Sequence, residues 1–345
     1  MKGRSTIRDV AQRAGVSTAT VSFVLNKNPK EVISEKVQKR VLEAARELNY
    51  HASAAASGLK RKSTHNVGVI FYRHDDAIAN PFYSFVVQGA VKEALERNYN
   101  LLFAFIESTY TGFDDLPKVI REKNVEGVLF MRHTYPKMIR DIQSLEIPIV
   151  AVDNFPRIRN IDSMQIDNRR GGQLAAEHLI ELGHKRLACL GPAHAPPSVE
   201  ERLLGFRQGL EKHDRKWSAQ SFIASKALTF EAAHDAALGA LTKNKQLTAI
   251  FCANDEMAAG VLRAARESGR ALPDDLSVVG FDDITMANYL DPPLTTIGVV
   301  KEHMGHRAMS RLIDLVEGSD RKVKTELAPV TLVIRASTAK ARTQK

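Results

Sequence analysis

The sequence predicts a small all-α domain followed by an α/β body of two lobes, each a doubly wound parallel sheet. Two patterns and one charge distribution support this expectation. Apolar residues recur at helical spacing in about the first fifty positions. Farther along, apolar runs of strand length alternate with amphipathic helical stretches. The positive charge gathers in the N-terminal part, which indicates that the two parts meet different partners.

Length and charge divide the chain in the same way. A chain of 345 residues exceeds one ordinary core, so two or three domains are expected. Residues 1–65 hold thirteen basic and five acidic residues, whereas the other 280 hold 36 basic and 35 acidic ones. A basic head on a nearly neutral body indicates a polyanionic partner. From charge alone, a solubilising basic tail is an equal alternative.

No sequence feature indicates secretion, a membrane or a disulfide framework. The N-terminal MKGRSTIRDV lacks the apolar region of a signal peptide. No apolar run approaches the roughly 18 residues that cross a bilayer. Cys189 and Cys252 lie within apolar runs and are expected to be buried free thiols. These features predict a cytoplasmic protein.

The stretch TIRDVAQRAGVSTATVSFVLN predicts two short helices joined by a turn at Gly15. Thr6 and Asp9 have the spacing of a capping box, and Ser17 is a good N-cap for the second helix. Ser34 is expected to cap a third helix. The residues expected to face inward are Ile7, Val10, Ala11, Ala14, Val21, Val24, Leu25, Val37, Val41, Ala45 and Leu48.

Two helices joined by a short turn and braced by a third make a helix-turn-helix domain, whose second helix lies in the DNA major groove. The outward face of the second helix is rich in small and hydroxyl residues, which suits base edges better than it suits a purely structural knob. The residues expected at double-stranded DNA are Thr6, Ser17, Thr18, Ala19, Ser22, Phe23 and Asn26.

This stretch closely resembles the start of the lactose-repressor (LacI/GalR) family of bacterial transcription regulators, and SEKVQKRVLEAARELNY continues the same pattern. One position differs, because many relatives carry a basic residue where this chain has Phe23. A basic side chain can bind guanine, whereas Phe23 can contact a thymine methyl or a base step. Covering part of the domain's core is the alternative role for Phe23.

Residues 51–65 are predicted to be a hinge. Their alanines favour helix, but Gly58 costs about 1 kcal/mol and so short a helix is not stable alone in water. The resemblance implies that the segment becomes helical on operator DNA, with a leucine wedged into the minor groove. The residues implied there are Leu59 at the base step and Lys60, Arg61 and Lys62 near phosphates. Ala52 and Ser53 replace the family's usual Pro-Asn. A flexible tether is therefore the alternative interpretation of this segment.

The body begins at about residue 66. Runs such as VGVIF, VEGVLFM and IPIVAVD predict parallel strands with helices on both sheet faces. The series is too long for one open sheet and breaks near residues 161–165. The expected domains are residues 1–50, 51–65 and 66–345, with one lobe of about 66–162 and 295–325 and the other of about 163–294 and 326–340.

Polar residues follow several of the predicted strands, where such sheets bind ligands. They are Asp153, Asn254 and Asp282, joined by Arg202 in the helix after LGPAHAPPS. Carboxylates, an amide and a guanidinium suit a small polyhydroxylated ligand. An aspartate after a strand is also often a helix N-cap, the role expected mainly for Asp255 and equally open for Asp283.

The body also resembles the effector domain of this family, itself similar to periplasmic sugar-binding proteins. LGHKRLACLGP, RLLGFRQGL, CANDEMAAGV, LSVVGFDDI and PPLTTI match in order, and with the head the resemblance spans about residues 6–337. It implies effector contacts from Phe82, Tyr83, Asp153, Arg202, Asn254 and Asp282. Val299 stands where relatives have a polar side chain, which makes the cleft less polar.

Together these features predict a homodimeric, ligand-controlled transcription regulator, most commonly a repressor in this family. It would bind a near-palindromic operator under control of a small effector, a sugar or sugar derivative. A purine or other non-sugar effector, or a sugar-binding protein without regulatory role, are the alternatives. No phosphate loop, dinucleotide fingerprint or nucleophile elbow occurs, so neither enzyme activity nor a cofactor is expected. HDDAIAN is expected to be a polar loop and not a metal site.

Overall fold

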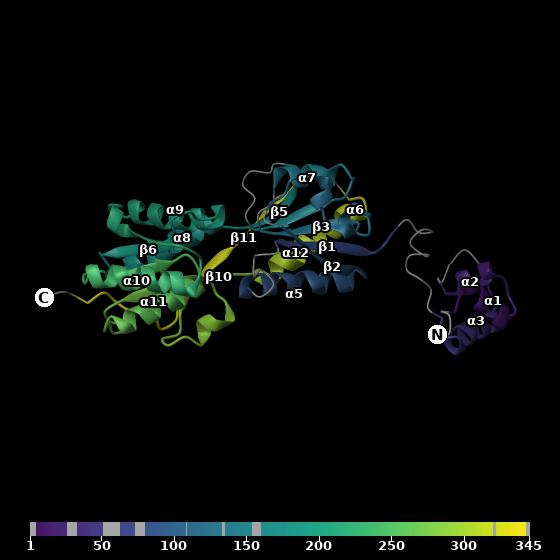
Figure 1. Ribbon diagram of the computed structural model, residues 1–345. Coiled ribbons are helices and arrows are strands. Elements are labelled where there is room, and N and C mark those ends of the chain that lie inside the picture. The colour runs from purple at the N-terminus through teal and green to yellow at the C-terminus, as the bar shows by residue number, and fades with distance from the viewer. Residues whose placement is uncertain are drawn as a thin grey trace. The chain divides into compact units, whose positions relative to one another are not determined.

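The computed structural model describes residues 5–25, 33–50, 63–72, 80–107, 109–132, 135–153, 160–319 and 322–342. The chain divides into two compact units, residues 1–64 and 65–345 (Figure 1). Within the described ranges, no helix is long and apolar enough to cross a membrane.

The first unit is a three-helix domain. Its helices are α1 (Ile7–Ala14), α2 (Thr18–Leu25) and α3 (Glu35–Glu47). Val10, Val21 and Val41 are fully buried at its centre. Gly15 ends α1 with a φ of +64°, a left-handed conformation that glycine adopts without strain. The predicted helix-turn-helix domain is therefore present.

The second unit contains two six-stranded sheets. The first, in the order β11-β5-β4-β3-β1-β2, is parallel throughout and is covered by α5, α6, α7 and α12. Its strands are β1 (Asn66–Tyr72), β2 (Asn100–Ile106), β3 (Gly127–Met131), β4 (Ile149–Val152), β5 (Asp162–Ile166) and β11 (Thr325–Ala328). Its helices are α5 (Pro81–Glu96), α6 (Lys118–Arg121), α7 (Pro136–Gln143) and α12 (Lys301–Val316).

The second sheet has the order β12-β10-β9-β8-β6-β7 and is parallel except for β12, which runs antiparallel to β10. Its strands are β6 (Leu187–Pro192), β7 (Phe222–Ser225), β8 (Ala249–Cys252), β9 (Ser277–Asp282), β10 (Thr295–Val299) and β12 (Val330–Val333). Its helices are α8 (Asn168–Glu181), α9 (Pro197–Lys212), α10 (Phe230–Lys243) and α11 (Asp255–Glu267).

The predicted limits of the lobes were wrong at each of the three places where the chain passes from one sheet to the other, after β5, β10 and β11. All of β5 and β11 belongs to the first sheet, although both were divided between the predicted lobes. Strand β10 belongs to the second sheet, although residues 295–325 were assigned to the first lobe. The reason is that β10 pairs with β9 and β12, and pairing between segments far apart leaves no mark in local periodicity.

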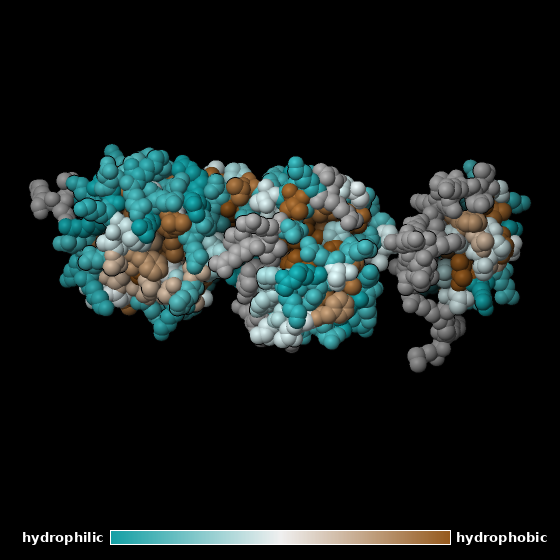
Figure 2. All heavy atoms as spheres, turned by 90° about the horizontal axis from the view of Figure 1, so that it is seen from above, coloured by the Kyte–Doolittle hydropathy of each residue, from teal (hydrophilic) through white to brown (hydrophobic). Residues whose placement is uncertain are grey.

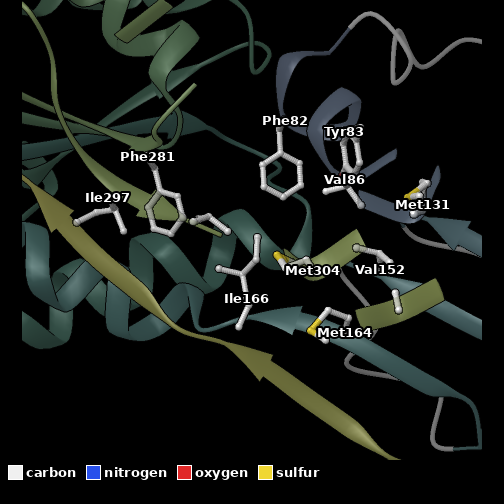
Figure 3. Close-up of a cluster of buried hydrophobic side chains, with 14 of the residues drawn as sticks. Phe82, Tyr83, Val86, Met131, Val152, Met164, Ile166, Phe281, Ile297 and Met304 are labelled. Carbon is white, nitrogen blue, oxygen red and sulfur yellow. The ribbon is translucent and has the colours of Figure 1, made fainter. Parts of the chain in front are cut away.

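The buried apolar side chains connect the lobes. One cluster contains Phe82 and Met164 of the first lobe together with Phe281 and Ile297 of the second (Figure 3). Both cysteines are buried and free, as predicted. Helices α5 and α12 pack with their backbones in contact at Gly305. A Cβ at this position would lie 1.8 Å from the carbonyl oxygen of Val86, so only glycine fits.

Candidate functional sites: the DNA-reading face and the effector cleft

The first turn of α2 forms the exposed end of the head. Thr18 and Ala19 are exposed, and Ser22 and Phe23 are half-buried. The hydroxyl oxygen of Ser17 accepts a hydrogen bond from the backbone N–H of Thr20 at 3.1 Å, so Ser17 caps α2 as predicted. With no acidic residue in this turn, the helix N-terminus is suited to a DNA phosphate.

The hydroxyl of Thr6 has a structural role. It takes part in the predicted capping box with Asp9, whose carboxylate accepts hydrogen bonds from the backbone N–H of Thr6 at 2.7 Å and from its hydroxyl at 2.8 Å. Ser34 precedes α3, but within the described residues its side chain makes no capping hydrogen bond. The remaining predicted DNA contacts, Asn26, Leu59, Lys60 and Arg61, lie outside the described residues.

In the first lobe, Tyr83 and Asp153 come together at the carboxyl edge of the sheet. The hydroxyl of Tyr83 donates a hydrogen bond of 2.8 Å to Oδ2 of Asp153. Oδ1 of Asp153 is buried and has no hydrogen-bond partner among the described residues. Burial raises the pKa of Asp153, and the charge of Arg202 opposes that rise. Phe82 packs edge-on against Tyr83, with ring centroids 5.0 Å apart, and belongs to the core.

In the second lobe, Arg202 of α9 is buried and held by several groups. Its Nε donates to Oδ1 of Asn168 at 2.8 Å, and its Nη1 donates to the carbonyl of Ala253 at 2.7 Å. The guanidinium carbon lies 3.8 Å from the ring centroid of Phe281. These contacts fix the guanidinium in one orientation.

Arg202 forms an ion pair with Asp282, the last residue of β9. Nη2 of Arg202 lies 3.0 Å from Oδ1 of Asp282. Oδ1 of Asp282 is buried, and Arg202 is its partner in this ion pair. Asp282 has a φ of +102°, which is costly for any residue with a Cβ.

Asn254 is the N-cap of α11. Its side-chain oxygen accepts the backbone N–H of Met257 at 2.8 Å, so this amide group is used by the fold itself. Asp255 was expected to be mainly an N-cap, but the N-cap is the preceding residue, Asn254. Asp255 is fully buried and accepts hydrogen bonds from the backbone of Ile284 and the hydroxyl of Thr296. Burial raises its pKa to about 8.

Known proteins match both parts of the chain. Residues 6–53 match the family of bacterial regulatory proteins called the lacI family, and residues 176–338 match the periplasmic binding protein-like domain. The HTH-type transcriptional repressor PurR of Photobacterium profundum is 32% identical, covering 96% of this chain and 98% of the relative. The chain belongs to the lacI family. It is a ligand-responsive, DNA-binding transcription regulator and not an enzyme.

Two further lacI-family proteins show the same full-length similarity. The ribose operon repressor of Escherichia coli (strain K12) is 32% identical, covering 95% of this chain and 98% of the relative. The structure of the Lac repressor dimer bound to operator and the anti-inducer ONPF is similar with a TM-score of 0.85 and 28% identity. It covers 98% of this chain and 100% of that one.

Sequence reasoning missed three residues that contact the predicted site residues. Asn168 orients Arg202, and Lys301 bonds to the backbone at Asp282. Arg132 follows β3, has a φ of +69°, and places its guanidinium 5.8 Å from the ring centroid of Tyr83. Arg132 follows a strand at the carboxyl edge, as Asp153 does, and that position was the available signal.

Proposed function

We propose that this protein is a homodimeric repressor whose α2 helices read the two halves of a near-palindromic operator, and that a sugar or sugar derivative in the cleft controls operator binding. Asp153, Arg202 and Asp282 are the proposed effector contacts. Residues 1–50 would act as the reading head, residues 51–65 as the hinge, and residues 66–345 as the effector and dimerisation domain. Because its partner is chromosomal DNA, we place the protein in the cytoplasm.

One observation carries the effector proposal. Oδ1 of Asp153 is a buried acceptor for which the described chain supplies no hydrogen-bond donor, whereas the buried Oδ1 of Asp282 has the guanidinium of Arg202 beside it. A buried acceptor left unpaired costs about 1–3 kcal/mol, so a ligand that donates hydrogen bonds would be favoured. Sugar hydroxyls donate and accept, and Arg202 can donate to their oxygens. Similarity to a ribose operon repressor agrees with this class of ligand.

The predicted alternative, a purine, rests on a different feature of the cleft. Val299 is buried at the end of β10, and the rings of Phe82 and Phe281 lie in the cluster shared by the lobes (Figure 3). Aromatic rings beside an apolar wall suit a flat heterocycle. Phe82 and Val299 are nevertheless core residues, so we favour the sugar.

A calorimetric titration with separate sugars and purines tests the effector. A sugar should bind the wild type, and the affinity should fall at least about tenfold in Asp282→Asn, since a good charge-assisted hydrogen bond contributes at least about 1.4 kcal/mol. The matched control is Asp274→Asn, whose exposed carboxylate pairs with Arg342. Binding of a purine and of no sugar would replace the sugar proposal with the alternative.

The surface of the body agrees with a homodimer. Leu95, Phe103 and Phe105 are large exposed apolar residues on α5 and on β2, an edge strand of the first sheet. Brown apolar areas interrupt the hydrophilic surface of both lobes (Figure 2). Exposed apolar residues on an edge strand favour pairing with another chain, and a second copy is the partner that a two-fold symmetric operator requires. Sedimentation of Phe103→Glu should show monomers if this face is the interface.

A further inference from the structure

Lys301, the first residue of α12, is a buried lysine with an unusual set of partners. It is 8% exposed, whereas lysines are rarely buried unless paired. Its Nζ donates to the backbone oxygens of Asp282, Asp283 at 2.9 Å and Val299 at 3.3 Å. An ammonium group has three N–H donors, so these three carbonyls use all of them.

The backbone that Lys301 holds is strained. Asp282 and Asp283 have φ values of +102° and +52°, both in a region that is costly for residues with a Cβ. Such a conformation persists only where neighbouring groups over-determine it. The Nζ of Lys301 is one such group, and it bonds to the residue whose carboxylate faces Arg202.

Lys301 also connects two lobes. The backbone of Asp282 ends β9 of the second lobe, whereas α12 packs on β3, β4 and β5 of the first. Helix α12 in turn contacts α5 through Gly305 without an intervening side chain. The Nζ of Lys301 lies 5.8 Å from the ring centroid of Phe85, one turn from the N-terminus of α5.

We propose that Lys301 is a positioning residue that couples the effector-binding carboxylate of Asp282 to α12 and α5 of the first lobe. The inference rests on the proposed function, since it takes Asp282 as an effector contact. When an effector shifts the end of β9, the bonds from Lys301 to the carbonyls of Asp282 and Asp283 carry that shift to the first turn of α12. The close contact at Gly305 then moves α5 with it, because packed backbones cannot absorb the displacement.

A purely local role for Lys301 would be charge compensation. Its charge is opposed by burial, which lowers the pKa of Lys301, and favoured by the carboxylates of Asp282, Asp283 and Asp255. In that role its loss would disturb only the end of β9. The coupling role requires that α5, on the other lobe, respond as well.

The experiment uses full-length protein, its operator DNA and D-ribose as the probe. Lys301→Met removes the ammonium and keeps the chain length, and Lys301→Arg restores a cation. Lys118→Met is the control, because Lys118 is an exposed lysine that pairs with Glu122 at the end of α6, away from α12 and α5. D-ribose affinity is measured with and without operator, and amide hydrogen exchange is followed in all variants without ligand.

In the wild type, operator should change D-ribose affinity by about 5- to 150-fold, the usual range of allosteric coupling. The ratio should fall to about 1 in Lys301→Met, recover in part in Lys301→Arg, and stay at the wild-type value in Lys118→Met. A folded Lys301→Met protein with the wild-type ratio would overturn the inference. D-ribose binding that operator leaves unchanged in the wild type would overturn it as well.

Hydrogen exchange decides the inference if D-ribose does not bind, an outcome that counts against ribose as the effector. In Lys301→Met, the amides at residues 282–284 and those in the first turns of α5 should both exchange faster than in Lys118→Met. Faster exchange confined to residues 282–284 would indicate local compensation and overturn the coupling. If Lys301→Met does not fold, the same comparison is made with Lys301→Arg, which keeps the charge but changes the donor geometry.

Discussion

The two buried carboxylates Asp153 and Asp282 are compensated in different ways. In the second lobe, Asp282 lies beside Arg202, whose other nitrogens are fixed by Asn168 and the backbone. In the first lobe, Asp153 receives a hydrogen bond from a neutral phenol, that of Tyr83, and burial raises its pKa. The second lobe therefore offers a preorganised ion pair. The first offers a carboxylate whose pKa burial raises, with the charges of Arg202 and Arg132 opposing that rise.

The largest expected effect comes from removing the ion pair. Arg202→Ala leaves the charge of Asp282 buried without its partner, which should lower the free energy of unfolding by about 3–5 kcal/mol and abolish effector binding. Arg207→Ala is the control on the same helix, because the exposed pair of Arg207 with Glu211 should contribute less than about 0.5 kcal/mol. Thermal unfolding followed by circular dichroism measures both. Equal melting temperatures for the two variants would mean that the second lobe is not held by this pair.

Asp255 supplies a second test in the same lobe, through pH. Its carboxyl has a pKa of about 8 against an ordinary value of 3.8, so it binds its proton more tightly in the folded chain than in the unfolded one. Between these values the folded state carries the extra proton, and stability from this group falls as pH rises. The slope is at most about 1.4 kcal/mol per pH unit.

Asp255→Asn should remove that slope, since the amide keeps the shape and does not titrate. Unfolding free energies at about pH 5.5 and about pH 7.5, obtained with urea, measure the change between those two conditions. Asp274→Asn, at an exposed carboxylate that pairs with Arg342, is the control. If the wild type is equally stable at both pH values while the variant is not, the buried carboxyl is not the titrating group.

Tyr83→Phe tests the weaker compensation of the first lobe. Loss of the phenol leaves Oδ2 of Asp153 without its donor, at a cost of about 1–3 kcal/mol. The pKa of Asp153 should rise further, because the hydrogen bond from Tyr83 lowers it. Effector affinity should then begin to fall at a higher pH on acidification than in the wild type. Tyr289→Phe, at a residue that is 80% exposed, should match the wild type in affinity and pH profile.

Local sequence signals predicted much of the fold. The capping box of Thr6, the turn at Gly15 and the apolar strands are set by neighbours within a few residues, and each is present. The lobe limits were predicted less well, because the sheet of β10 depends on pairing with β9 and β12. Periodicity cannot distinguish one sheet from another.

The candidate site residues also fall into those that the sequence predicted and those that it could not. The sequence placed Asp153 and Asp282 at the ends of strands and Arg202 in a helix after a strand, where parallel sheets bind ligands, whereas Tyr83 was implied only by the family resemblance. It could not assign Asn254 to the N-cap of α11 rather than to the ligand, since both roles use the same amide oxygen. Lys301 had no signal, because its partners are backbone carbonyls, which every residue carries.

The smallest expected effect, at Arg132, decides whether the comparison between the lobes holds. The charge of Arg132 lowers the pKa of Asp153 and so helps to keep this carboxylate ionised. Arg132 is half-buried and acts on Asp153 through space, so Arg132→Gln should weaken effector binding by less than about tenfold. Arg132→Lys keeps the charge and should stay closer to the wild type. Calorimetry on both variants measures the difference.

We expect effector affinity to fall from the wild type to Arg132→Lys and then to Arg132→Gln. Either of two other outcomes would change the description of the first lobe. If Arg132→Lys is as weak as Arg132→Gln, the planar guanidinium above Tyr83 matters more than its charge. If both variants lose binding altogether, Arg132 contacts the effector itself. The first lobe would then carry a guanidinium and a carboxylate placed for the ligand, as the second lobe does with Arg202 and Asp282. The two lobes would differ in geometry but not in how they compensate charge.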